Sequence, residues 1–388
     1  MNVRMIALGV VAAGAMALGS AALAQNVPSQ FVVSGKAAEQ IQDFTTINLA
    51  TAERIAETCE KLAIAQGVAI SIMVLDNDGN HVYMDRMDGQ GYLNIVTAEM
   101  KARTALMGRE PSKNRMNRVV QDPTQELQLI QLGFFANSGG LPIVANKQLI
   151  GVVGVGGSAP RVPVWSDEIC AHKALTEVIG PSVAPLVQDL PPRQNPNPGT
   201  APVPRFVAAA PPTSSLSPEF VIGAKAATNV FDANQISLTA AKKIARVCRD
   251  WAASKGGSMS LYIIDTAGEF VHIERMDGQV FNNIRTAMLK AQTSLRTRQP
   301  TSINAAQLRN NPAGLPRSTA YFDLFTNSGG MPIVVDGQMI GAIGVGGGAG
   351  GGGDENCAIE GLKATFGEHV TLPVYPATTT AAGSGGAR

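Results

Sequence analysis

The chain has 388 residues, a formal net charge of +1, 16% charged residues and 45% hydrophobic residues. This length exceeds the usual range of a single domain and predicts two domains, each with its own buried core. The near-neutral charge gives no electrostatic basis for binding nucleic acid or an anionic membrane surface.

Residues 1–24 have the pattern of a secretory signal peptide. Arg4 supplies the positive charge, Met5–Leu18 is apolar and small, and Ala22-Leu23-Ala24 fits the A-x-A cleavage rule. An uncleaved anchor is the alternative, which the short, Ala- and Gly-rich apolar stretch disfavours. We therefore predict a periplasmic or secreted protein with no membrane span after cleavage.

The first domain is predicted to cover residues 27–188 and to begin with a helix and a hairpin. Apolar residues at helical spacing follow Asn48, which is a suitable N-cap residue. Two strands are predicted next, at Ala69–Leu75 and His81–Asp85, joined by a turn at Asp76–Gly79.

The second half of this domain is predicted as a helix over about Ile95–Met107, an irregular segment at Pro111–Gln131, a hairpin, and a last helix near Ser166–Ile179. The hairpin is predicted from FFANSGGLPIVANKQLIGVVGVGG, which starts at Phe134. A glycine turn there precedes two apolar runs with a polar break between them, and a glycine-rich loop follows. Two hairpins with helices imply a mainly antiparallel sheet covered by helices, an α+β fold.

The whole pattern occurs twice. LFTNSGGMPIVVDGQMIGAIGVGG starts at Leu324, Ser237 takes the N-cap position of Asn48, and most equivalent positions differ by 189. The second domain is predicted at 217–377, after a Pro-rich linker at 189–216. The tail at 378–388 consists of Ala, Thr, Gly, Ser and one Arg, and is predicted to be disordered.

Each copy holds two cysteines, one in its first helix and one in its last. The symmetric pairs are Cys59 with Cys170 and Cys248 with Cys357. An even number at repeated positions favours disulfides in an oxidising compartment, and four buried thiols are the alternative. No C-x-x-C or C-x-x-C-H is present, so no metal site and no covalent haem attachment is predicted.

Repeated cations are the first candidates for ligand binding: Arg86 and Lys101, with their counterparts Arg275 and Lys290. Cations near a glycine-rich loop suit carboxylates, such as the propionates of a porphyrin or a small organic acid. The alternative is structural, with Arg86 paired to Asp88 at the turn and Lys101 extending to solvent.

The two glycine turns are the second candidates. Their successive small residues are able to form a nest of N–H groups for an anion, or the glycines serve only a positive φ. No dinucleotide-binding or P-loop spacing accompanies them. The residues concerned are Asn137, Gly139, Gly140, Asn327, Gly329 and Gly330.

Two aligned positions hold residue types that bind ferric haem. They are Tyr83 and His272, and a hydrogen-bonded structural role is the alternative for a histidine on a strand. No H-E-x-x-H, no G-x-S-x-G and no repeated Ser/His/Asp set supports hydrolase chemistry.

The repeated motifs resemble the GlcG/HbpS-like haem-binding family, and also the C-terminal domain of a corrinoid adenosyltransferase. They are Asp76-x-x-Gly79, Arg86-Met87-Asp88-Gly89, Lys101-Ala102-Arg103-Thr104-Ala105, Gly139-Gly140-Leu141-Pro142-Ile143 and Ile150-Gly151-x-x-Gly154-Val155. The resemblance implies two profilin-like α/β/α domains, a tendency to form oligomers, and a haem pocket near Arg86, Lys101 and the glycine turn. An acidic residue expected five positions before the helix lysine is Val96 in the first copy and Arg285 in the second.

These patterns lead to one main hypothesis and two alternatives. The main one is non-covalent binding of haem or a related tetrapyrrole for sensing, storage or delivery, by two domains packed as an intramolecular pseudo-dimer or a larger oligomer. The first alternative is an enzyme acting on a small organic acid or aromatic compound through the same Lys and Arg residues. The second is an accessory subunit of a periplasmic oxidoreductase or sensor.

Overall fold

The computed structural model describes residues 28–35, 45–158, 164–181, 183–188, 190, 214–222, 234–310, 323–347 and 353–373. The predicted signal peptide, nearly all of the predicted linker and the predicted tail lie outside these ranges. Within the part of the chain that is described, no helix is both long and apolar enough to span a bilayer.

The first domain contains two hairpins and their covering helices. Its elements are η2 (Ser29–Phe31), α1 (Leu49–Ala65), β1 (Ser71–Asp76), β2 (His81–Arg86), α2 (Tyr92–Gly108), α3 (Lys113–Gln121), α4 (Gln125–Gln131), β3 (Gly140–Ala145), β4 (Gln148–Gly156) and α5 (Asp167–Val178). The Asn48 side chain accepts a hydrogen bond from Thr51 N and caps α1, as predicted.

The segment at Pro111–Gln131 was predicted to be irregular, and this was wrong. Most of it forms the helices α3 and α4. The apolar residues of α3 are Met116, Val119 and Val120, which have helical spacing but extend over less than two turns. A run this short among polar residues gives little sequence signal for a helix.

The second domain repeats this order. Its elements are α6 (Leu238–Ser254), β5 (Ser260–Ile264), β6 (Phe270–Arg275), α7 (Phe281–Thr297), α8 (Thr301–Asn310), β7 (Gly330–Val335), β8 (Gln338–Gly346), α10 (Gly353–Phe366) and η5 (Gly367–His369). Ser237 caps α6 by accepting from Ala240 N, which confirms the prediction at this position.

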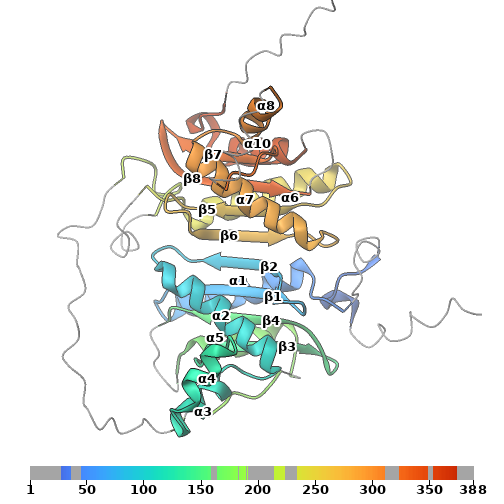
Figure 1. Cartoon of the computed structure of the whole chain (residues 1–388), viewed down its shortest axis with the longest axis vertical. Helices are drawn as coiled ribbons and strands as arrows, with labels where there is room; N and C mark the ends of the chain where they lie inside the picture. The colour runs from blue at the N-terminus through green and yellow to red at the C-terminus, as the bar shows by residue number, and fades with distance from the viewer. Residues whose placement is uncertain are drawn as a thin grey trace, which may run out of the picture.

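The two domains share one antiparallel sheet. Its strand order is β3-β4-β1-β2-β6-β5-β8-β7 (Figure 1). Each domain contributes four strands, and the domains join where the last strand of one set, β2, pairs with the last strand of the other, β6. In this central pair Met84 lies opposite Ile273, and these are equivalent positions of the two copies. A pseudo-twofold axis therefore passes through this pair, and the fold is α+β with two tandem α/β/α domains.

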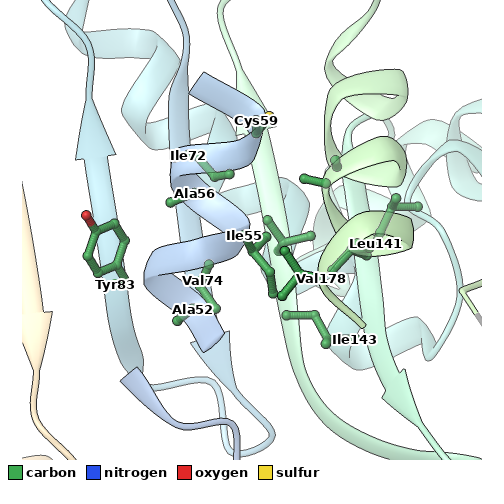
Figure 2. Packing of buried hydrophobic residues seen from close by; sticks show 14 of the residues in the cluster. Ala52, Ile55, Ala56, Cys59, Ile72, Val74, Tyr83, Leu141, Ile143 and Val178 are labelled. Carbon is green, nitrogen blue, oxygen red and sulfur yellow. The ribbon is translucent and has the colours of Figure 1, made fainter. Parts of the chain in front are cut away.

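Helices cover both faces of the shared sheet. On one face α1 and α5 enclose a core in the first domain, and α6 and α10 enclose a second core. Figure 2 shows Ala52, Ile55 and Ala56 of α1 packed over the strands of the first core. On the opposite face α2 and α7 cover a third core, to which both domains contribute.

Close packing explains the glycines of the second hairpin strand. A Cβ at Gly154 would lie 2.0 Å from Ala98 O of α2, and one at Gly344 would lie 1.9 Å from Ala287 O of α7. These glycines lie within β4 and β8, not in the predicted loop after the hairpin. They allow a helix to lie directly on the sheet.

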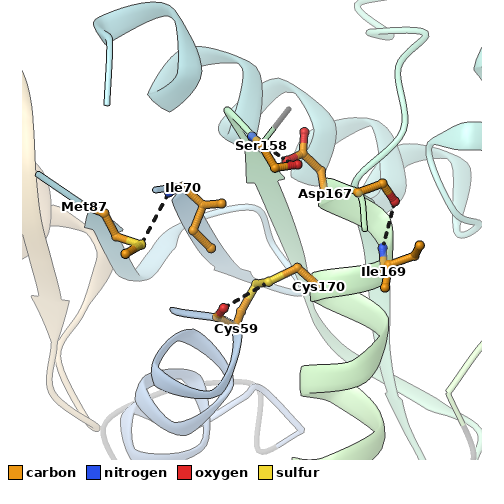
Figure 3. Close-up of a disulfide and its surroundings, with 8 residues drawn as sticks. Cys59, Ile70, Met87, Ser158, Asp167, Ile169 and Cys170 are labelled. Atoms are coloured by element: carbon orange, nitrogen blue, oxygen red, sulfur yellow. Dashed lines mark hydrogen bonds between the residues drawn. A yellow bond between two sulfur atoms is a disulfide. The ribbon is translucent and has the colours of Figure 1, made fainter. Parts of the chain in front are cut away.

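Two disulfides join the first and last helices of the domains. Cys59 is bonded to Cys170 (Figure 3), and Cys248 is bonded to Cys357, which confirms the symmetric pairing. Each bridge closes a loop of similar length, since the separations are 111 and 109 residues. In the chain-entropy model a loop of this size contributes at most about 4–5 kcal/mol to stability.

Candidate functional site

The helix lysine of each domain is buried and has two oxygen partners. Lys101 Nζ lies 2.7 Å from Asp167 Oδ2 and 3.0 Å from Val155 O. The second domain repeats this arrangement, with Lys290 Nζ 2.6 Å from Asp354 Oδ2 and 2.7 Å from Val345 O. The lysine therefore links its helix to the second hairpin and to the start of the last helix, and it does not extend to solvent.

The predicted glycine turn lies beside this lysine. A Cβ at Gly140 would lie 2.1 Å from Lys101 O, so the turn and the helix backbone are in close contact. Gly139 has a φ of 114°, a conformation that favours glycine. The structure therefore brings together Lys101, Gly139 and Gly140, and it brings together Lys290, Gly329 and Gly330 in the same way.

Protein oxygens already accept from part of the turn backbone. Gly140 N donates to Ser112 Oγ, and Ser138 N donates to Asn137 Oδ1. The Ser112 hydroxyl in turn donates to Asn137 O. Thr301 takes the place of Ser112 in the second domain, where it contacts Gly330 N and Asn327 O. These bonds match the conformational role of the turn better than an open anion nest.

The two strand-end arginines lie at the contact between the domains. Arg86 Nη2 lies 2.5 Å from Asp265 Oδ2, and Arg275 Nη2 lies 2.7 Å from Asp76 Oδ2. A structural Arg–Asp pair was the predicted alternative, but with Asp88 of the same turn as the partner. The partner is instead an aspartate of the other domain, which the sequence could not show because the domain contact was unknown.

Asp88 and its counterpart Asp277 also connect the domains. Asp88 Oδ1 accepts from Leu238 N at 2.8 Å, and Asp277 Oδ1 accepts from Leu49 N at 2.8 Å. Each carboxylate thus binds the first turn of a helix in the opposite domain, where the N–H groups have no partner within the helix. Burial raises the pKa of both carboxyl groups above the usual value.

Next to this contact lies a cleft of about 780 Å³. It is formed by residues around η2 and the β1–β2 turn of the first domain and by the loop between β6 and α7 of the second. This volume is within the range of small-molecule sites, about 300–1,000 Å³. The lining includes Val33, Ile47, Val82, Met276, Val280 and Phe281, together with Asp76, Asp78, Asp277 and Arg275.

The lining of the cleft is polar as well as apolar. Val33, Ile47 and Val82 are buried, Phe281 is 49% exposed, and Arg275 is the one cation in the described part of the lining, beside the carboxylates of Asp76, Asp78 and Asp277. Among the described residues that line the cleft, Met276 alone is of a type that ligates haem iron, and its Sδ accepts from Met259 N. A tetrapyrrole would therefore be held there mainly by ring contacts.

The two residues predicted as axial ligands lie at the domain contact and away from solvent. His272 is fully buried, with Nδ1 2.5 Å from Asp85 Oδ1 and Nε2 2.9 Å from Glu274 Oε1. Neither ring nitrogen is then free for iron in this structure. Tyr83 is also buried and packs edge-on against the His272 ring at 5.3 Å. The hydrogen-bonded structural role, which was the alternative for a histidine on a strand, describes His272 better.

The histidine belongs to a charged cluster between α1 and α6. Burial alone would lower the pKa of His272, but the carboxylates of Asp85 and Glu274 outweigh it and raise this pKa to about 9. Burial, together with repulsion from Asp85, raises the pKa of Glu60 to about 8. Among the described residues no group of His, Cys, Asp and Glu has the arrangement of a metal site.

Sequence reasoning missed this cluster and the aspartate partners of the helix lysines. The signal for the cluster was present, because Glu53 and Glu60 of α1 align with Lys242 and Arg249 of α6 at the common offset of 189. Asp167 and the aligned Asp354 were also detectable, since both lie at the start of the last helix.

The fold and the duplicated contacts define a tandem α/β/α protein. The family model described as "Haem degrading protein HbpS-like" matches residues 47–176 and again residues 236–363. The chain therefore belongs to the HbpS-like family, which confirms the resemblance inferred from the repeated motifs.

Several known proteins are similar to a single domain of the chain. An uncharacterised 15.0 kDa protein from the dhaT–dhaS intergenic region of Citrobacter freundii is 32% identical over 138 residues, which is 34% of this chain and 93% of that protein. A crystal structure of a Streptomyces reticuli HbpS double mutant is 29% identical, with a TM-score of 0.32, and covers 38% of this chain and 96% of that one. A crystal structure of a PduOC–haem complex is 21% identical, with a TM-score of 0.31, over 34% and 94% of the two chains.

Proposed function

We propose that this protein binds haem or a related tetrapyrrole non-covalently, for sensing, storage or delivery. The observation that carries the proposal is the match of both copies to the HbpS-like family, whose description refers to haem. The sequence pattern of a signal peptide and the two disulfides support an exported protein, where both bridges would remain oxidised.

The cleft between the domains is the proposed site. It has the volume of a small-molecule pocket, and its lining includes the exposed side chains of Val280 and Phe281. Of the residues predicted to bind ligand, Arg275 lines this cleft. Its side chain is paired with Asp76, so a propionate would compete with or join this ion pair.

The other residues predicted to bind ligand support the framework in this proposal. Lys101 and Lys290, with their glycine turns, hold α2 and α7 against the hairpins. Arg86 occupies the position equivalent to Arg275 and donates to Asp265, Phe270 O and Gln90 O. The alternative of an enzyme with a lysine acid or base would require one of these ammonium groups to leave its aspartate first.

Haemin titration of the purified protein, followed by the Soret band, tests the proposal. Phe281→Ala removes the ring at the cleft, and Tyr92→Ala is the matched control because Tyr92 is its 50% exposed counterpart. We expect saturable binding that Phe281→Ala weakens roughly threefold to tenfold, the size of a lost aromatic contact, while Tyr92→Ala leaves it unchanged.

Two results would contradict the proposal in different ways. A titration without a saturable Soret change would refute tetrapyrrole binding. Saturable binding that responds equally to both substitutions would refute the cleft as the site. A time course at fixed haemin separates binding from degradation, because binding leaves a stable Soret band and degradation removes it.

A further inference from the structure

The charged contacts between the two domains fall into two classes. The first class is reciprocal under the pseudo-twofold axis. Arg86 with Asp265 repeats as Arg275 with Asp76, and the carboxylate-to-helix bonds of Asp88 and Asp277 repeat in the same way. Because both copies supply the same residues, these contacts would form equally well between two identical domains.

The second class is not reciprocal, because the sign of charge differs between the copies. Position 53 is Glu in α1, and the aligned position 242 is Lys in α6. Position 60 is Glu, and the aligned position 249 is Arg. The pseudo-twofold axis places these helices next to each other across β2 and β6, so the acidic helix contacts the basic one.

The contacts across this boundary are short. Lys242 Nζ lies 2.7 Å from Glu60 Oε2 and 2.8 Å from Asp85 Oδ2. Arg249 Nη1 lies 3.0 Å from Glu53 Oε2.

The strand carboxylates beneath the helices are present in both domains. Asp85 of β2 aligns with Glu274 of β6, and both are buried. Arg249 Nη1 also lies 3.4 Å from Glu274 Oε2. Each strand carboxylate thus has a cation of α6 beside it. On the strands His272 replaces Tyr83, whereas on the helices the sign of charge is reversed between the domains.

We infer that these helix charges determine which domain pairs with which: the pairing face of the first domain accepts the second domain and rejects another copy of itself. Pairing two first domains through the same face would bring together the carboxylates of Glu53, Glu60 and Asp85 from each, with none of the cluster's cations. Pairing two second domains would place Lys242 of one against Arg249 of the other. Like charges in a partly desolvated contact disfavour both arrangements.

This pairing rule limits how two chains can associate through this face. The first domain of one chain is able to pair with the second domain of another, as in an exchanged dimer. It does not pair with the other chain's first domain. The two copies therefore recognise each other as different proteins, although they have the same fold.

Two charge-reversed versions of the full chain test the inference. The basic variant carries Glu53→Lys and Glu60→Arg, so both helices at the contact are basic. The acidic variant carries Lys242→Glu and Arg249→Glu, so both are acidic. A control with the charge change of the basic variant carries Glu126→Lys and Glu177→Lys, at exposed positions of α4 and α5.

We expect each variant alone to lose at least 5 °C in melting temperature, while the control changes by less than 2 °C. The chain carrying all four substitutions should recover most of the loss, because the acidic and basic helices have only exchanged places. Mixing the basic and acidic variants in equal amounts should give a two-chain complex by light scattering, in which every domain pairs with one of opposite charge.

The losses of melting temperature in the basic and acidic variants can be added. The inference is overturned if the chain with all four substitutions loses as much as this sum. It is also overturned if either variant alone is as stable as the control. A mixture of the two variants that contains no two-chain complex would equally contradict the pairing rule.

Discussion

The two domains have the same architecture but differ where they meet and on one outer surface. The disulfides, the buried lysines, the glycine turns and the Arg–Asp contacts are the same in both. The helix charges at the contact are opposite. In a dimer of identical chains every substitution would occur on both sides, whereas in a tandem chain each copy can change alone. The difference shows which contacts maintain the fold and which make the two copies distinct.

The outer helices show the second difference. Along α2, Leu93, Met100 and Met107 are exposed apolar residues at intervals of seven, and Tyr92 is exposed beside Leu93. The aligned positions on α7 are Asn282, Leu289 and Arg296, so this surface is more polar in the second domain. Since the inner faces of both helices pack on one common core, the fold tolerates either surface.

The largest expected effect concerns a feature that the domains share. Replacing Cys59 and Cys170 by serine should destabilise the first domain by up to about 4–5 kcal/mol, and the same change at Cys248 and Cys357 should cost the second domain an equal amount. The reason is that the two closed loops have nearly the same length. Denaturant unfolding of both variants measures this.

A large difference between the two disulfide variants in the lost free energy of unfolding would contradict the equivalence of the domains. It would mean that one domain depends on contacts the other lacks. The single variants Cys59→Ser and Cys248→Ser also break one bridge each, so their difference from the double variants measures the effect of the second buried serine.

The second prediction concerns the asymmetric contact. Lys242→Met leaves Glu60 and Asp85 without their shared cation and should cost about 3 kcal/mol, near the lower end for breaking a buried ion pair because Lys242 is 20% exposed. The matched substitution Glu53→Met removes one of two acidic partners of Arg249 and should cost less. Equal losses in the free energy of unfolding of the two variants, measured in urea, would contradict the larger role given to Lys242.

The third prediction is a loss of stability as pH rises. The folded state raises the pKa of His272 from 6.5 to about 9. The contribution of protonated His272 to the free energy of unfolding is therefore complete below pH 6.5 and is lost as pH rises through 9. The pKa of Glu60 is raised from 4.5 to about 8, so the folded state also loses stability between these values as this carboxyl ionises.

Asp85 has the opposite effect at low pH. Burial would raise its pKa, but Lys242 and His272 hold it well below the usual 3.8, so stability is lost as pH falls below that value. Melting temperature should therefore be highest near pH 4 to 4.5 and should fall as pH rises, first through Glu60 and above pH 6.5 through His272 as well. In His272→Gln the decline from pH 6.5 to 9 should become shallower, and an unchanged slope would assign it to other groups.

The smallest expected effect concerns the outer surface. Leu93 is 70% exposed, and Leu93→Asn gives it the residue of its counterpart Asn282. Stability should change by less than about 0.5 kcal/mol, as is usual for surface substitutions. A larger loss in thermal unfolding would show that this surface is covered in the native protein.

The sequence alone determined the duplication, the α+β class and the cysteine pairing. These depend on local patterns and on symmetry between the copies: apolar spacing, turn residues such as Asp336-Gly337, and aligned cysteines. Such signals are contained within short segments or in the offset between them. They need no knowledge of which surfaces meet.

Only the tertiary structure decided how the charged residues are used. Arg86 pairs with an aspartate 179 positions away in the other domain, and His272 lies between Asp85 and Glu274 because β2 and β6 are neighbours. The partner of a charged side chain depends on which strands form the edges of the sheet and in what register they meet. The cleft lined by Arg275 and Phe281 arises from the same edge-to-edge contact, so it appears only when both domains are in place.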